Sequence, residues 1–248
     1  MKVQGNTILI TGGATGIGLA LAAKFLSLGN EVIICGRRDE RLQAAKEKFP
    51  KLHIIKCDVS KKEGRAALHD WISANFRDLN ILINNAGIQR AIDLRKGEED
   101  LLRNEDEIEI NLRSQIYLAA TFIPDFSKKF HAAIVNVSSG LGFVPFAVFP
   151  IYCATKAAIH SFTLSLRHQL RESSIKVFEV IPPTVYDTEL KGKPIPKTDY
   201  SVSKSEVADA VALGIEKDEY EIAIGPSKGW VESSGSGGLD QAFKNMNH

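Results

Sequence analysis

The sequence predicts a doubly wound α/β fold, in which a seven-stranded parallel sheet carries helices on both of its faces. Short apolar runs alternate with longer amphipathic stretches from residue 7 to about residue 225, and this alternation is typical of βαβ units, whose strands are parallel. No internal repeat or linker divides the 248 residues, so a single domain is expected. The hydrophobic share of 44% and the charged share of 25% are those of an ordinary globular chain.

Seven runs rich in isoleucine, valine and leucine are predicted to be strands, at residues 7–10, 32–34, 53–55, 81–83, 133–137, 176–181 and 221–224. Between them, apolar residues recur at helical spacing, which predicts helices at residues 17–28, 40–49, 61–76, around 111–128, 152–170 and 204–216. Gly29 and Pro50 end the first two helices, since glycine favours a helix C-terminus and proline cannot continue a helix.

Two segments differ from this pattern. Residues 184–203 are rich in lysine and proline and are expected to form a mobile flap. The Ser-Ser-Gly-Ser-Gly-Gly run at residues 233–238 predicts a flexible hinge before a short terminal helix at residues 239–246. The expected division is therefore a main domain over residues 1–229, which includes the flap, and a hinge with a short helix over residues 230–248.

Composition excludes several classes of function. The chain has 31 basic and 30 acidic side chains, so it lacks the electrostatic footprint of a protein that binds nucleic acid or an anionic membrane. The longest apolar stretch, residues 141–151, is interrupted by glycine and proline and falls far short of the ~20 residues of a spanning helix. No secretion signal or metal-ligand spacing is recognisable. Because Cys35, Cys57 and Cys153 lie in apolar surroundings, we expect buried reduced thiols and a cytoplasmic location.

A glycine-rich turn, TGGATGIG at residues 11–18, joins the first predicted strand to the first predicted helix. In a βαβ unit this turn places backbone N–H groups where they can bind the pyrophosphate of a dinucleotide, as in Rossmann-type folds. Gly12 permits the tight turn, Gly16 lets the backbone approach phosphate, and Gly18 allows the helix to pack closely on the strand. Thr15 and Ile17 belong to the same binding turn. The alternative interpretation is a plain strand-to-helix turn.

The end of the second strand indicates which dinucleotide would bind. A carboxylate there would select NAD through the ribose 2′-OH, but this chain has Cys-Gly-Arg-Arg at residues 35–38. The Arg37 guanidinium can pair in a bidentate manner with a 2′-phosphate, which favours NADP(H). Because Asp39 and Glu40 follow closely, NAD(H) stays possible, and arginines that merely cap a solvated turn are the alternative.

Tyr152 and Lys156 are four residues apart near the start of a predicted helix, so they lie on one face of it. A phenol has a pKa of about 10, and a nearby ammonium group lowers this pKa towards the working range of an acid/base catalyst. Ser139 follows the fifth strand, where ligands gather in such sheets, and its hydroxyl could bind a substrate oxygen. A surface tyrosine and lysine would be the alternative reading.

Together these motifs resemble the short-chain dehydrogenases/reductases. The resemblance rests on TGGATGIG at residues 11–18, Cys57-Asp58-Val59, NNAG at residues 84–87, Asn111, Ser139 and YCATK at residues 152–156. It extends from residue 5 to about residue 225, with the motifs in the family's order and spacing. Residues 31–37, 85–89 and 152–170 are similar to the DltE-type bacterial oxidoreductases within that family.

The resemblance implies catalytic roles for four residues. Tyr152 would be the general acid in reduction and the general base in oxidation. Lys156 would lower the pKa of that phenol and hold the nicotinamide ribose, and Ser139 would orient the substrate carbonyl. Asn111 would keep a water molecule in a proton relay behind Lys156, and its amide could also satisfy a kinked helix.

The resemblance also implies cofactor contacts. Asp58 would accept a hydrogen bond from the adenine amino group, although a simple strand-end turn is the alternative, and Asn85 would line the cofactor and stabilise the central strand. The remaining expected contacts are made by Val59, Ala86, Gly87 and a threonine that binds the nicotinamide amide. In this family the threonine usually follows a Pro-Gly pair after the sixth strand. Here that pair is Pro-Pro and the threonine lies one residue later than usual, so Thr188 is expected and Thr184 is the alternative.

The expected function is an NADP(H)-dependent oxidoreductase that interconverts a carbonyl and a secondary alcohol by hydride transfer. Residues 141–151 predict an apolar or aromatic wall beside the substrate, with core or dimer contacts as the alternative. Lys191, Lys193 and Lys197 could attract an anionic substrate, or they could be solvated surface lysines. A homodimer through the helices around 111–128 and 152–170 is expected, with a tetramer as the alternative.

Two other classes of function compete with this one. A non-catalytic dinucleotide-binding regulator would not require Ser139, Tyr152 and Lys156 together. An enzyme that uses bound nucleotide for dehydration or epimerisation is disfavoured by the spacing of the glycines and by the short carboxyl-terminal part.

Overall fold

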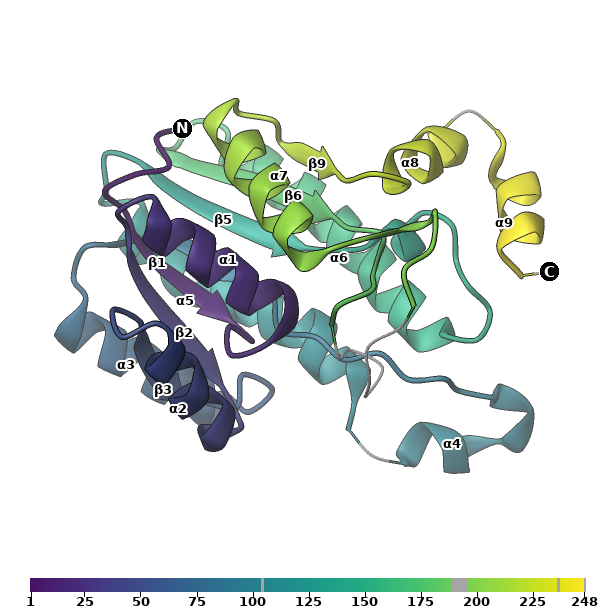
Figure 1. Ribbon diagram of the computed structural model, residues 1–248, viewed down its shortest axis with the longest axis horizontal. Coiled ribbons are helices and arrows are strands. Elements are labelled where there is room, and N and C mark those ends of the chain that lie inside the picture. The colour runs from purple at the N-terminus through teal and green to yellow at the C-terminus, as the bar shows by residue number, and fades with distance from the viewer. Residues whose placement is uncertain (104, 189–195, 236, 248) are drawn as a thin grey trace.

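The computed structural model describes residues 1–103, 105–188, 196–235 and 237–247. Its main sheet has seven strands in the order β3-β2-β1-β4-β5-β6-β9, and every neighbouring pair is parallel (Figure 1). The predicted doubly wound fold is confirmed. The strands are β1 (Thr7–Thr11), β2 (Glu31–Gly36), β3 (His53–Lys56), β4 (Leu79–Asn84), β5 (Ala132–Val137), β6 (Ile175–Ile181) and β9 (Glu221–Ala223).

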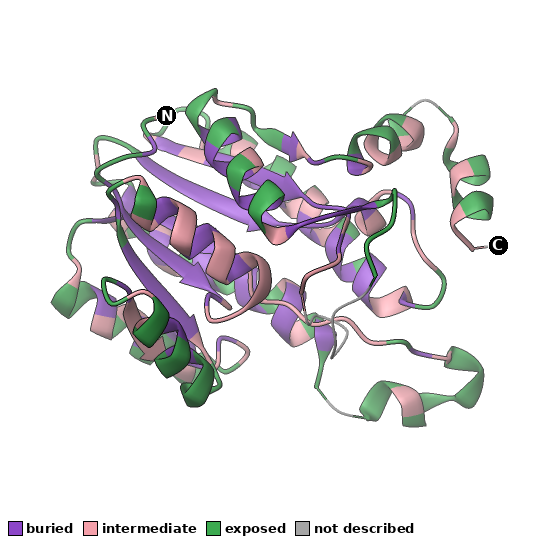
Figure 2. Ribbon diagram, viewed as in Figure 1, coloured by how far each residue is buried: buried purple, intermediate pink, exposed green. Residues whose placement is uncertain are grey.

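Helices cover both faces of this sheet. Strand residues alternate between the two faces: Ile8 and Ile10 pack on one side while Leu9 packs on the other. The first side is covered by α1 (Gly16–Ser27), α2 (Asp39–Lys48) and α7 (Lys204–Glu216). The second side is covered by α3 (Lys62–Asn75), α5 (Ser114–Phe126) and α6 (Pro150–Gln169). Figure 2 shows the strands buried between these layers, and burial on both faces explains why the strands are continuous apolar runs.

Several short elements lie outside the predicted pattern. They are η1 (Leu94–Lys96), α4 (Glu98–Leu102), the π-helical turn η2 (Ile108–Arg113), η3 (Gly140–Gly142), β7 (Thr184–Val185), β8 (Ser201–Val202) and α8 (Ser227–Gly235). The helix α9 (Leu239–Asn247) agrees with the short terminal helix predicted at residues 239–246. Residues 88–107, which we call the β4–α5 loop, carry η1 and α4 away from the sheet (Figure 1). The described ends of the expected flap are joined, because Thr184 and Val185 pair with Ser201 and Val202. Residues 189–195 of that flap, with Lys191 and Lys193, lie outside the described residues.

The expected hinge at residues 233–238 is wrong for residues 233–235, which form the end of α8. Ser233 Oγ donates to the carbonyl of Gly229 (2.7 Å) and Ser234 Oγ donates to that of Val231 (2.8 Å). These bonds supply partners for helix carbonyls, so the serines continue the helix. The expected boundary between residues 229 and 230 consequently falls inside α8.

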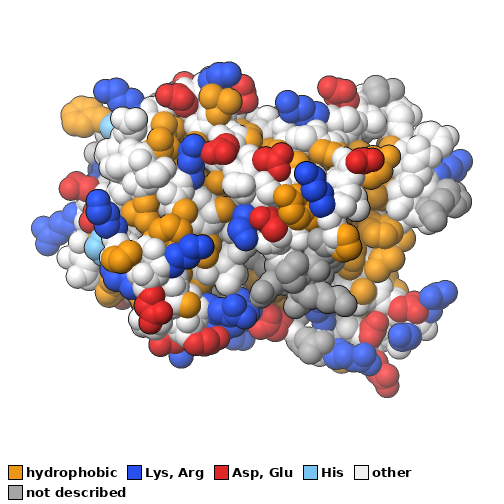
Figure 3. Space-filling view, in the orientation of Figure 1, with side chains coloured by type: hydrophobic (Ala, Val, Ile, Leu, Met, Phe, Trp, Pro, Cys, Tyr) orange, Lys and Arg blue, Asp and Glu red, His pale blue; other side chains and the backbone are white. Residues whose placement is uncertain are grey.

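The cysteines and the surface charges agree with the sequence. All three cysteines are free and buried. In Figure 3 the visible face carries basic and acidic side chains interspersed, in keeping with a net charge of +1. Within the described ranges, no helix is long and apolar enough to cross a membrane. The same residues hold no cluster of three or more His, Cys, Asp or Glu side chains suited to a metal ion.

Candidate active site

A cavity of about 1160 Å³ lies over the carboxyl ends of the parallel strands. This edge is where ligands bind in open α/β sheets, because the strand-to-helix turns of several units converge there. Nearly all the predicted site residues line the cavity: Gly12, Thr15, Gly16, Ile17, Arg37, Asp58, Val59, Asn85, Ala86, Gly87, Ser139, Tyr152, Lys156 and Thr188. Gly18 and Asn111 are not among the residues that line it.

The glycine turn has the conformation that its glycines were expected to allow. Gly12 and Gly16 have φ angles of +64° and +56°, which are costly for other residues. A Cβ atom on Gly18 would lie 2.4 Å from the Gly12 carbonyl oxygen and 2.6 Å from Asn85 Nδ2. Glycine at position 18 therefore allows the first turn of α1 to pack directly on the loop that precedes it.

Hydrogen bonds from the two residues after β4 hold this turn in place. Thr11 Oγ1 accepts hydrogen bonds from the backbone N–H groups of Asn85 and Ala86, both at 3.0 Å. Asn85 Nδ2 donates to the carbonyls of Thr11 (2.9 Å) and Gly12 (3.2 Å). Asn85 thus ties the residues after β4 to the end of β1 and to the glycine turn.

The amino terminus of α1 fits a pyrophosphate. Thr15 is the N-cap residue, and its side chain makes no capping hydrogen bond. The first N–H groups of a helix have no partners within it, and the helix dipole adds positive potential at the same point. Gly16 and Ile17 present this helix end to the cavity. The turn therefore has both the donors and the space that a dinucleotide requires.

The opposite end of the cavity would hold the adenosine. Asp58 Oδ1 accepts from the N–H and the hydroxyl of Ser60 at 3.0 and 2.7 Å, so Asp58 does form the strand-end turn considered as the alternative. Arg37 extends from the end of β2 and pairs with Glu105, with an Nη2–Oε2 distance of 3.0 Å. Sequence reasoning missed Glu105, since nothing in the acidic stretch of residues 98–109 distinguishes it from its neighbours.

Tyr152 and Ser139 meet at the cavity wall. Burial disfavours the phenolate and raises the pKa of Tyr152 to about 12, while a hydrogen bond with Ser139 opposes this shift. Ser139 is positioned by the start of η3, where its Oγ accepts from the N–H of Leu141 at 3.2 Å. The serine hydroxyl and the phenol can therefore converge on one substrate oxygen.

Lys156 lies one helical turn after Tyr152 and is almost fully buried. Its Nζ donates to the Val137 carbonyl at 2.8 Å and lies 5.5 Å from the centroid of the Tyr152 ring. Burial lowers the pKa of Lys156 to about 8, and the charge of Glu179 opposes that change. Tyr152 and Lys156 thus lie close together on α6, but the expected lowering of the phenol pKa by Lys156 is wrong for this structure, because burial dominates and raises the pKa of Tyr152.

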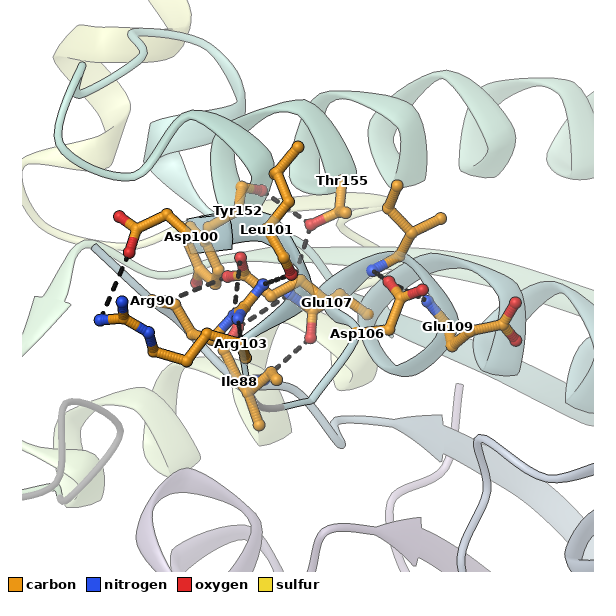
Figure 4. Close-up of polar contacts among 12 residues, drawn as sticks. Ile88, Arg90, Asp100, Leu101, Arg103, Asp106, Glu107, Glu109, Tyr152 and Thr155 are labelled. Atoms are coloured by element: carbon orange, nitrogen blue, oxygen red, sulfur yellow. Dashed lines mark hydrogen bonds and ion pairs between the residues drawn. The ribbon is translucent and has the colours of Figure 1, made fainter. Parts of the chain in front are cut away.

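Asn111 lies in the π-helical turn before α5. Its Nδ2 donates to the Ile88 carbonyl and its Oδ1 accepts from the Ile88 N–H, both at 2.8 Å. Nδ2 also reaches Thr155 Oγ1 at 3.3 Å, and this hydroxyl donates to the Tyr152 carbonyl at 2.7 Å (Figure 4). The described contacts of the amide thus join η2 to Ile88 and, through Thr155, to α6, whereas the sequence suggested that the amide satisfies a kinked helix. Sequence reasoning missed Thr155.

A second buried cluster lies next to Ser139 and Lys156 and was also missed. Glu179 on β6 is fully buried and accepts from Ser138 Oγ at 2.5 Å, while its other oxygen lies 2.8 Å from His160 Nδ1. This carboxylate raises the pKa of His160. A signal was present, because a carboxylate inside the apolar run VFEVI needs a partner.

The end of the cavity next to Tyr152 is largely apolar. Leu141 and Phe146 of the predicted wall line it. Phe143 instead packs on His160, with 4.5 Å between ring centroids, and Phe149 is buried, as the alternative interpretation expected. Side chains of the carboxyl-terminal helices, which sequence reasoning did not place here, complete this end: Trp230, Ser233, Ala242, Asn245 and Met246.

The two candidate threonines both line the cavity. Thr188 Oγ1 donates to the Val185 carbonyl at 3.0 Å, and its Cγ2 lies 3.5 Å from the position of a Cβ on Gly16. Thr188 therefore lies next to Gly16 of the glycine turn. Thr184 starts β7 and borders the same space, so both positions suit a nicotinamide amide.

Comparison with known proteins identifies the family of this chain. Residues 6–198 match the model of the short chain dehydrogenases. The chain belongs to this family. It is 46% identical over 250 residues to the oxidoreductase DltE of Bacillus subtilis (strain 168), covering 100% of this chain and 98% of DltE, which agrees with the expected DltE-type resemblance.

Two further relatives are less similar to this chain. The NADP-dependent 3-hydroxy acid dehydrogenase YdfG of Escherichia coli (strain K12) is 32% identical over 187 residues, or 73% of each chain. A serine dehydrogenase solved in its closed form with NADP⁺ has a TM-score of 0.73 and 27% identity, and the match covers 83% of this chain and 87% of that one. These relatives place the present chain among oxidoreductases that act on CH–OH and C=O groups.

Proposed function

We propose that the protein is an NADP(H)-dependent oxidoreductase that interconverts a carbonyl compound and a secondary alcohol, with Tyr152 as the acid/base. The observation that carries this proposal is the convergence of Ser139, Tyr152 and Lys156 on a cavity whose other end is formed by the glycine turn and Arg37. A nucleotide bound to the turn and to Arg37 would extend along the cavity towards the tyrosine.

The chain's own residues supply the proton chemistry. When bound, NADPH supplies the hydride for the carbonyl carbon. Ser139 and Tyr152 donate hydrogen bonds to the carbonyl oxygen and so stabilise the negative charge that develops there. Tyr152 then gives its proton to this oxygen, and the ammonium of Lys156 stabilises the phenolate that remains. Acid catalysis of this kind contributes typically 10²–10⁴-fold to a rate.

The choice of NADP(H) rests on Arg37. Its guanidinium lines the adenosine end of the cavity, where a fork of N–H donors matches the oxygens of a 2′-phosphate. Both YdfG, which is NADP-dependent, and the serine dehydrogenase solved with NADP⁺ support this choice. NAD(H) is the alternative, because Asp39 and Glu40 follow the arginine pair.

The substrate is expected to have an apolar body. Leu141, Phe146, Trp230 and Met246 line the end of the cavity that a substrate would occupy, and apolar walls with a few placed polar groups are typical of sites for small organic ligands. We also propose a cytoplasmic homodimer. The outer faces of α5 and α6 expose apolar side chains, such as Leu164, that a second copy could cover.

A titration followed by a screen tests the proposal. Purified protein is titrated with NADPH and with NADH by nucleotide fluorescence, and then mixed with NADPH and a panel of apolar aldehydes and ketones. We expect tighter binding of NADPH and loss of NADPH absorbance with some members of the panel. Failure of both nucleotides to bind would overturn the assignment, and binding without turnover of any carbonyl or alcohol would favour the regulator.

A further inference from the structure

The ion pair between Arg37 and Glu105 joins two distant parts of the chain. Arg37 comes from the end of β2 and Glu105 from the β4–α5 loop, 68 residues further on. Both nitrogens at the end of the guanidinium are used: Nη1 bonds Oε1, and Nη2 bonds Oε2 at 3.0 Å. Both residues also line the cavity, so the pair stands at the position assigned to the 2′-phosphate.

A carboxylate and a phosphate compete for such a guanidinium. Each accepts two parallel hydrogen bonds from the same edge of the fork, so Arg37 cannot bind both in this way at once. A carboxylate that stays beside a bound phosphate also repels it. Glu105 therefore resembles an internal substitute for the anionic group of the cofactor.

We propose that Glu105 is a specificity-determining residue that occupies Arg37 in the free protein and is displaced by the 2′-phosphate of NADP(H). This inference rests on the proposed use of NADP(H). Binding of NADPH has to break the ion pair, whereas NADH has no group that competes for Arg37. Glu105 consequently narrows the difference in affinity between the two nucleotides.

The surroundings of Glu105 allow this exchange. Its side chain is 46% exposed and that of Arg37 is 38% exposed, so each can move into solvent without leaving a buried charge. Contacts that do not involve Glu105 hold the base of the loop (Figure 4). The backbone N–H of Arg90 donates to the buried Glu107 at 3.0 Å, and the Arg90 guanidinium donates to the carbonyls of Leu101 (3.2 Å) and Arg103. Loss of the Glu105 charge therefore leaves the loop anchored.

The size of the effect follows from this exposure. Exposed ion pairs contribute about 0.2–1 kcal/mol, which corresponds to a factor of about 1.4–5 in affinity. Relief of the repulsion between carboxylate and phosphate acts in the same direction. We expect Glu105→Gln to lower the Kd of NADPH about threefold to tenfold.

The test uses the full chain and four variants. Kd values for NADPH and NADH are measured at low and high salt for the native protein, Glu105→Gln, Arg37→Ala and the double variant. Glu98→Gln, on the same loop but in α4, is the matched control for loss of one negative charge. Thermal unfolding of every variant reports whether folding is intact.

The proposal predicts tighter NADPH binding by Glu105→Gln, with the Kd of NADH changed less than about twofold and no effect of Glu98→Gln. In the Arg37→Ala background the gain should shrink to the part that comes from relief of repulsion, since Glu105 then has no guanidinium to occupy. An unchanged NADPH affinity in Glu105→Gln, or an equal gain for both nucleotides, would overturn it.

These results separate failure of this inference from failure of the proposed function. If the native protein prefers NADH and Arg37→Ala does not weaken NADPH binding, the assignment of NADP(H) itself is wrong. If the native protein prefers NADPH and Arg37→Ala weakens it, but Glu105→Gln has no effect, only the role of Glu105 is wrong.

Discussion

Replacement of Gly18 by alanine tests the packing that creates the pyrophosphate site. The added Cβ would lie 2.4 Å from the Gly12 carbonyl oxygen, 2.6 Å from Asn85 Nδ2 and 2.9 Å from Gly13 Cα. A carbon and an oxygen normally stay about 3.4 Å apart, so the start of α1 must move by about 1 Å. Overpacking of this kind costs about 1–3 kcal/mol.

We therefore expect Gly18→Ala to lower the Tm by about 2–12 °C, since each kcal/mol shifts the Tm of a chain of this size by about 2–4 °C. The moved N–H groups should also weaken NADPH binding by about tenfold or more. Thermal unfolding and nucleotide fluorescence measure the two effects. Gly235→Ala is the control, because its Cβ would meet nothing within 4 Å. A Gly18→Ala protein with native Tm and native affinity would refute the argument.

Two further substitutions address the proton chemistry and the substrate. Glu179→Gln removes the charge that supports the Lys156 ammonium, so the pKa of Lys156 should fall further below its present value of about 8. As the pH rises, the rate of carbonyl reduction should then begin to fall at a lower pH than in the native protein. An alkaline decline at the same pH as in the native protein would contradict this. Phe146→Ala removes an aromatic wall from the cavity and should lower kcat/KM for bulky apolar carbonyls by roughly 5- to 100-fold. An equal loss for a very small aldehyde would instead indicate a general disturbance of the site.

The sheet was predictable because its signals are local. Buried strands such as β1 and β5 are short apolar runs, and helices such as α6 show helical periodicity within themselves. Tyr152 and Lys156 were predictable for the same reason, since four residues make one turn. Strands β7 and β8 contain two residues each, which is too short for any periodic pattern.

The groups that were missed depend on contacts between distant residues. Glu179 meets Ser138 across 41 residues, and Glu105 meets Arg37 across 68. Each partner on its own looks like an ordinary polar residue of a strand end or loop. The helical end of α8 was missed because its Ser-Ser-Gly composition suggests flexibility, whereas Trp230 of that helix packs directly against Gly140.

The central claim is that Tyr152 carries out acid/base chemistry at a nucleotide site, and Tyr152→Phe tests it most directly. The variant keeps the ring that packs in the wall and removes only the hydroxyl. NADPH affinity and the single-turnover rate of hydride transfer to a carbonyl substrate found in the screen are measured side by side. We predict a rate lower by about 10²–10⁴-fold with a Kd for NADPH within about threefold of the native value. A Tyr152→Phe protein that transfers hydride at the native rate would contradict the claim.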